Sequence, residues 1–200
     1  FPTPVVSRQA CVCTPTCFVP IDRVRIIGER INPTGKKRLK QAILEQDFDY
    51  ILSQGLSQLE AGAQILDVNM GMPEVDESRM LPLVIQKLQG VLDAPLQIDS
   101  SNVKAIEQAL RLYNGKPIVN SVNGEDGSMN AILPLVKKYG AAVVALTLDD
   151  KGIPLLAEER FAIAERIVAR AEQYGIPRED IYVDCLTLTA SVQQKEVVET

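Results

Sequence analysis

The chain has 200 residues, a formal net charge of −5 and 46% hydrophobic residues, enough apolar material for the core of one domain. Its densest basic run, Lys36-Lys37-Arg38, is too short for a nucleic-acid surface, so we expect no nucleic-acid partner. No apolar run approaches the ~20 residues that cross a bilayer, and the start does not resemble a signal peptide. We therefore expect a cytoplasmic location and no membrane partner.

Residues 1–22 contain four prolines and little helical periodicity. This composition is typical of a linker, so we interpret 1–22 as a linker from a preceding domain and 23–200 as a barrel domain.

Three cysteines, Cys11, Cys13 and Cys17, lie close together in this linker. Their Cys-x-Cys-x3-Cys spacing differs from the usual Cys-x2-Cys of zinc sites, and the chain has no His to complete one. We therefore expect no metal and a reduced, flexible segment. Cys185 follows a predicted strand, and we expect it to be buried as a small hydrophobic residue.

From residue 23 onward, short apolar runs alternate with amphipathic stretches, which predicts parallel strands joined by helices. The predicted strands cover residues 23–27, 64–68, 96–99, 117–120, 142–146 and 181–184. The predicted helices cover residues 36–44, 49–61, 77–91, 102–113, 128–139 and 158–174.

An open doubly wound sheet and a TIM (β/α)8 barrel both fit this α/β alternation. The first strand is not followed by Gly-x-Gly-x-x-Gly, which removes the main support for a dinucleotide-binding sheet. Polar residues end nearly every strand rather than gathering at one switch point. We therefore predict a TIM barrel, truncated after about the sixth strand, with two open strand edges and low stability.

Carboxylates and amides lie at the ends of the predicted strands, where they would converge at one mouth of the barrel. The candidate binding residues are Glu29, Asp67, Asn69, Asp99, Asn120 and Asp184. Such a ring suits a flat polar heterocycle with several N–H groups. Because the chain has no His, we expect neither a metal site nor a His-dependent catalytic triad within it.

Each candidate also has a structural alternative. Asp99 and Asp184 could cap a following helix, and Glu29 could form a local ion pair with Arg30. Asn120 can both donate and accept a hydrogen bond, which suits a ring nitrogen that gains or loses a proton. Asn123 precedes Gly124 and is assigned to a turn.

Five blocks of the chain resemble the pterin-binding domain of cobalamin-dependent methionine synthases and the related methyltetrahydrofolate:corrinoid methyltransferases. The blocks are Ile27–Lys37, Gly62–Asn69, Gln97–Ser100, Tyr113–Gly124 and Ile181–Asp184. The resemblance covers about residues 24–200.

This resemblance implies a barrel similar to that of dihydropteroate synthase, which binds 5-methyltetrahydrofolate. The family's pterin contacts correspond to Asp99, Asn120 and Asp184, and we assign Asn120 the catalytic role. The N5-methyl group would pass to cob(I)alamin on a separate domain or corrinoid protein. It would then pass to homocysteine, which an upstream domain binds through zinc. The family's last two strands, with a further Asn near N5, have no counterpart here.

Three other readings remain open. Dihydropteroate synthases have an Asn-Val-Thr-Pro-Asp-Ser-Phe loop, whereas residues 30–35 read Arg-Ile-Asn-Pro-Thr-Gly, without the Asp or the Ser-Phe pair. A truncated barrel could bind a pterin without turnover. A Schiff-base aldolase would need a lysine at a strand end, and the nearest candidate, Lys151, lies in a predicted loop.

Overall fold

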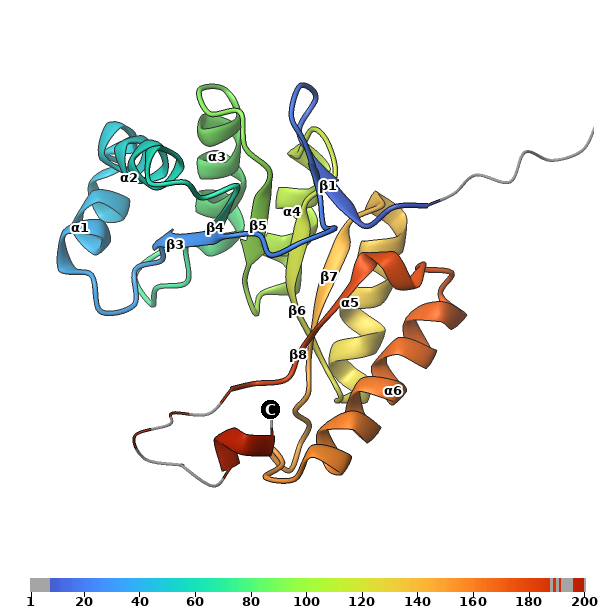
Figure 1. Cartoon of the computed structure of the whole chain (residues 1–200). Helices are drawn as coiled ribbons and strands as arrows, with labels where there is room; N and C mark the ends of the chain where they lie inside the picture. Colours follow the sequence, from blue (N-terminus) through green and yellow to red (C-terminus); the bar gives the residue numbers. More distant parts are fainter. Residues whose placement is uncertain (1–7, 188, 190, 192–195, 200) are drawn as a thin grey trace, which may run out of the picture.

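The computed structural model describes residues 8–187, 189, 191 and 196–199. Within them, six parallel strands form one sheet in the order β3-β4-β5-β6-β7-β8, the same order as in the chain (Figure 1). The strands are β3 Ile27–Ile31, β4 Ile65–Asn69, β5 Leu96–Asp99, β6 Ile118–Asn123, β7 Ala142–Leu146 and β8 Ile181–Asp184. A doubly wound sheet would reverse its order at a switch point. The predicted barrel of six strands is therefore confirmed, with β3 and β8 as its two edges.

Helices that connect the strands lie along one face of the sheet (Figure 1). They are α1 Lys37–Glu45, α2 Phe48–Glu60, α3 Glu77–Gln89, α4 Val103–Leu112, α5 Asp126–Tyr139 and α6 Ala157–Gln173. A short 3₁₀ helix, η1 Arg178–Asp180, precedes β8, and another, η2 Glu196–Glu199, follows it. Strand residues that face these helices, such as Leu66, Ile98 and Val143, are fully buried in the main core. Among the described residues, no helix is long and apolar enough to span a membrane.

The first strand is shifted from its predicted position at 23–27 to β3, Ile27–Ile31. Pairing with β4 begins only at Ile27, opposite Ile65, and Val24 is 92% exposed. The pairing position of a strand is specified weakly where its faces are not buried, and in β3 only Ile31 is buried. Glu29 consequently lies inside the strand rather than after it.

The described part of the expected linker, residues 8–22, is an ordered hairpin and not a flexible segment. Its strands β1, Cys11–Cys13, and β2, Phe18–Pro20, pair antiparallel. Val12 and Val19 pack into a second buried cluster with strand residues Ile65, Ile118 and Ala142. Pro15 and Pro20 do not break this hairpin, because Pro15 lies between the two strands and Pro20 is the last residue of β2. Whether 1–22 also joins a preceding domain stays a prediction.

Polar contacts attach the hairpin to segments that precede strands. Cys13 and Lys116 exchange two backbone hydrogen bonds of 3.0 Å just before β6. Thr14 Oγ1 donates to Asp93 Oδ1 at 2.6 Å just before β5, and Tyr113 Oη donates to the Cys13 carbonyl at 3.1 Å. The hairpin therefore covers the amino-terminal ends of the strands, as Figure 1 shows for β1.

The cysteines differ from expectation in their surroundings. The thiols of Cys11, Cys13 and Cys17 are free and half-buried in the hairpin. Cys185, expected to be buried, is exposed because it follows β8, an edge strand of the described sheet.

If the hairpin is part of the folded domain, a charge at Val12 will be costly. Val12 has no exposed surface, so Val12→Asp would bury an unpaired carboxylate and should lower the free energy of unfolding by about 3 kcal/mol or more. Val24→Asp, at a 92% exposed position, is the matched control and should change it by less than about 0.5 kcal/mol. Urea unfolding measures both, and equal effects would mean that the hairpin is detached.

Candidate functional site

Three polar residues lie side by side at the carboxyl ends of neighbouring strands. The strand register pairs Asn69 of β4 with Asp99 of β5, and Asp99 with Asn120 of β6. Asn69 Nδ2 donates to Asp99 Oδ2 at 3.0 Å. The other oxygen of Asp99 remains available to accept from a ligand, as a carboxylate can hold several hydrogen bonds.

The capping alternative for Asp99 does not apply. Asn102 caps α4, since its Oδ1 accepts from the backbone N–H groups of Lys104 and Ala105. Burial raises the pKa of Asp99, and the hydrogen bond from Asn69 opposes that rise. Asp99 therefore does not cap a helix, and Asn69 holds its carboxylate in place. Both features suit Asp99 to bind a ligand.

Asp99 and Asn120 share a cavity of about 490 Å³ between the loops that follow β5 and β6. Its polar lining also includes Ser100, Ser101, Ser121, Asn123, Glu125 and Ser128, and its apolar lining includes Val103, Ala131 and Ile132. This volume falls in the range of small-molecule sites. Asn123, which we assigned to a turn, is the last residue of β6, and its Oδ1 accepts from the Glu125 N–H at 3.0 Å in the bend that follows.

A second polar pair lies one row deeper on the same side of the sheet. Asp67 is opposite Gln97 in the register, and Gln97 Nε2 donates to Asp67 Oδ1 at 2.7 Å. Burial, followed by the charge of Asp99, raises the pKa of Asp67 to about 7, although side-chain hydrogen bonds from Gln97 and Asn120 oppose the rise. The site therefore contains a carboxyl group that titrates near neutrality.

Gln97 is the one member of this network that we did not predict. Its signal in the sequence is a polar amide two residues before Asp99, inside an apolar strand. Alternation along a strand places Gln97 and Asp99 on the same side, so a polar residue at this spacing belongs to the same interior face.

The raised pKa of Asp67 predicts a pH dependence of stability. Between the ordinary value of 3.8 and about 7, the folded chain binds more protons at Asp67 than the unfolded chain does. Protonated Asp67 therefore contributes fully to the free energy of unfolding below pH 3.8. This contribution is lost as the pH rises to 7, at about 1.4 kcal/mol per pH unit. Asp67→Asn should remove this loss, so its stability relative to the parent chain should increase from pH 4 to pH 7. Urea unfolding across that range tests this, and parallel pH profiles would contradict it.

Of the predicted site residues, Asp99 and Asn120 line the shared cavity. Asp67 and Asn69 adjoin it through the strand register but do not line it, and Glu29 and Asp184 lie outside it. Glu29 is exposed and forms an ion pair of 3.2 Å with Lys36, not with its neighbour Arg30. Asp184 is exposed at the end of β8, where its Oδ1 accepts from the Leu186 N–H at 2.8 Å. The register pairs Asp184 with Leu146 rather than with the row of Asp99. Pterin contacts by Glu29 and Asp184 therefore stay proposals.

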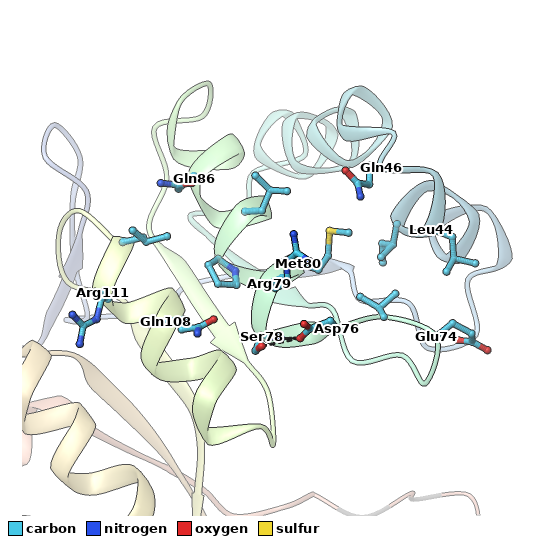
Figure 2. Close-up of a pocket in the computed structure, with 15 residues that line it drawn as sticks. Leu44, Gln46, Glu74, Asp76, Ser78, Arg79, Met80, Gln86, Gln108 and Arg111 are labelled. Carbon is cyan, nitrogen blue, oxygen red and sulfur yellow. Dashed lines mark hydrogen bonds between the residues drawn. The ribbon is translucent and has the colours of Figure 1, made fainter.

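Another hollow, of about 660 Å³, lies on the outer helical face between α1, α3 and α4 (Figure 2). None of the predicted site residues lines it. Its Asp76 caps α3 through the Ser78 N–H, and its Met80 and Ile43 belong to the core. We place the functional site at the strand ends instead, because buried or half-buried carboxylates and amides adjoin one another there.

Comparison with known proteins shows the family of the chain. The family described as pterin binding enzyme matches residues 28–199. The chain belongs to this pterin-binding family. Two curated relatives are methionine synthases from Mycobacterium leprae (strain TN) and Mycobacterium tuberculosis (strain ATCC 25618 / H37Rv), each 31% identical over 179 residues. The match covers 86% of this chain and 15% of each relative, so the chain spans a small part of their length.

Solved structures similar to this pterin-binding chain include dihydropteroate synthases. The enzyme from Xanthomonas albilineans with 4-aminobenzoic acid has a TM-score of 0.69 at 21% identity, covering 94% of this chain and 70% of that one. The enzyme from Yersinia pestis with a pterine-sulfa conjugate has a TM-score of 0.67 at 17% identity, covering 92% and 69%. At these identities the likeness establishes the shared barrel fold. The predicted resemblance to the pterin-binding domain of methionine synthases is confirmed by the sequence relatives.

Proposed function

We propose that this chain binds 5-methyltetrahydrofolate at the mouth of its barrel and presents the N5-methyl group for transfer to cob(I)alamin. The observation that carries the proposal is the pairing of Asp99 and Asn120 on one cavity at the carboxyl ends of β5 and β6. The acceptor would be held by a separate domain or corrinoid protein, as part of methionine synthesis from homocysteine.

The polar groups match the edge of a reduced pterin. The ring presents a row of N–H donors, and the free oxygen of Asp99 can accept one of them in a charge-assisted hydrogen bond. Asn69 fixes the other oxygen, so the carboxylate does not need to be ordered when the ligand binds. The ring would thus be held in one orientation, with its methyl group toward the opening.

Asn120 provides the chemistry that this chain can contribute. Its side-chain amide favours the ionised form of Asp67, and an amide can both donate and accept toward a ligand. N5 of methyltetrahydrofolate leaves poorly until it gains a proton or a strong hydrogen bond. A donor fixed close to N5 would stabilise the transition state as the carbon–nitrogen bond breaks, and the remaining contribution is orientation. Zinc belongs to the upstream homocysteine domain in this scheme.

Two measurements on the 200-residue chain test this proposal. Calorimetry should detect binding of 5-methyltetrahydrofolate, and Asp184→Asn should weaken it if Asp184 contacts the ring. Addition of free cob(I)alamin should then yield methylcobalamin, followed by its absorbance. Binding without turnover would favour a pterin-binding module over an enzyme, and absence of binding would overturn the proposal.

A further inference from the structure

Gln97 is buried in the barrel interior with one of its two polar atoms unsatisfied. The residue is 8% exposed, and its Nε2 donates to Asp67 at 2.7 Å. Its Oε1 is buried and has no hydrogen-bond partner in the described part of the chain. Leaving a buried acceptor without a donor is costly, so this oxygen requires a donor from a ligand or a water molecule.

The contact with Asp67 fixes which way the amide points. An ionised carboxylate only accepts hydrogen bonds, so it holds the NH₂ group of Gln97 and turns Oε1 away. A protonated Asp67 can donate instead, and then the amide can rotate so that Oε1 accepts from Asp67 and the NH₂ group faces away. The polarity that Gln97 presents to the interior thus depends on one proton.

We propose that Gln97, two residues before Asp99 on β5, is a specificity-determining residue, presenting its oxygen to a ligand N–H group while Asp67 is ionised and its NH₂ group when Asp67 is protonated. This inference rests on the proposed function, since the ligand in question is the reduced pterin ring. Under this proposal, the row of side chains below Asp99 distinguishes a ring that donates a hydrogen bond at this point from a ring that accepts one.

The charges around Asp67 place this change near neutral pH. Asp99 on β5 and Glu29 on β3 both disfavour the ionised form of Asp67, and burial acts in the same direction. The amides of Gln97 and of Asn120 on β6 favour the ionised form. Glu29 is itself paired with Lys36, so its influence is weakened. With these effects together, the pKa of Asp67 is about 7.

The first experiment needs no ligand. In the full chain, the side-chain ¹⁵N resonance of Gln97 and the ¹³C carboxyl resonance of Asp67 should titrate together between pH 5.5 and 8.5. The titration of Gln97 should disappear in Asp67→Asn. A Gln97 resonance that does not change across this range would overturn the inference.

The second experiment measures 5-methyltetrahydrofolate affinity by calorimetry at pH 6.0 and 8.5. Gln97→Met retains the length of the side chain but cannot accept from the ring, so it should weaken binding about tenfold at pH 8.5. At pH 6.0 the parent chain presents a donor to the ring, so the difference should shrink to about twofold or less. An equal loss at both pH values would mean that Gln97 acts through packing alone.

Gln58→Met is the matched control. Gln58 is equally buried, but both of its amide atoms are used: Oε1 accepts from the Arg30 N–H at 2.7 Å and Nε2 donates to the Gln54 carbonyl at 3.0 Å. Its replacement should lower stability without a pH-dependent change in affinity. If Gln97 and Asp67 titrate together in the parent chain but no folate binds at either pH, the proposed function fails. The pH-dependent rotation of the Gln97 amide then still stands. If the parent chain binds folate but Gln97 does not titrate, only this inference fails.

Discussion

Asn120→Ala is expected to slow methyl transfer to cob(I)alamin by about 100-fold or more while weakening folate binding by less than about tenfold. Removal of one donor that stabilises a transition state has effects of this size on turnover. The variant loses the amide that favours the ionised form of Asp67, but the carboxylate of Asp99 remains to hold the ring. Single-turnover transfer under saturating folate measures the rate, and calorimetry measures the binding.

Asn130→Ala serves as the control for this variant. Asn130 lies on the outer surface of α5, where its Oδ1 accepts from Arg170 at 3.1 Å. Its removal should leave both rate and affinity unchanged. Equal losses of rate and affinity in Asn120→Ala would show that Asn120 only binds the substrate.

Asp99→Asn is expected to weaken binding of 5-methyltetrahydrofolate by about 10- to 100-fold. The substitution keeps the shape but removes the charge from the hydrogen bond, and it places an NH₂ group where the ring and Asn69 both bring donors. Because burial raises the pKa of Asp99, the affinity of the parent chain should also fall as the pH drops through that raised value.

Asp150→Asn, in the exposed loop after β7, is the matched charge-removing control and should bind as the parent chain does. Calorimetry at several pH values compares the three proteins. Unchanged affinity in Asp99→Asn would remove Asp99 from the site.

The barrel could be predicted from the sequence because most of its strands have a strong local pattern. Leu96–Asp99, Ala142–Leu146 and Ile181–Asp184 were predicted with the bounds that the structure gives. The first strand could not be placed in this way. Its position depends on pairing with Ile65, 38 residues away from Ile27, and not on its own composition.

The hairpin was missed for a related reason. The valines of β1 and β2 are ordinary in sequence, and they are buried only because the strand ends of the barrel provide a surface for them. Among the site residues, strand ends and alternation were sufficient to indicate Asp99, Asn69 and Asn120. Gln97 required a further step, the recognition that one polar residue inside a strand faces another across the register.

The long sequence separation of the hairpin contacts has a consequence for synthesis of the protein. Val12 needs Ile65, Ile118 and Ala142 for burial, and the Tyr113 hydroxyl that binds the Cys13 carbonyl is 100 residues later. On the ribosome, residues 8–20 therefore emerge long before their binding surface exists. During that interval three thiols and two valines are open to oxidants and to chaperones, so nascent chains are the form in which Cys11, Cys13 and Cys17 are most vulnerable.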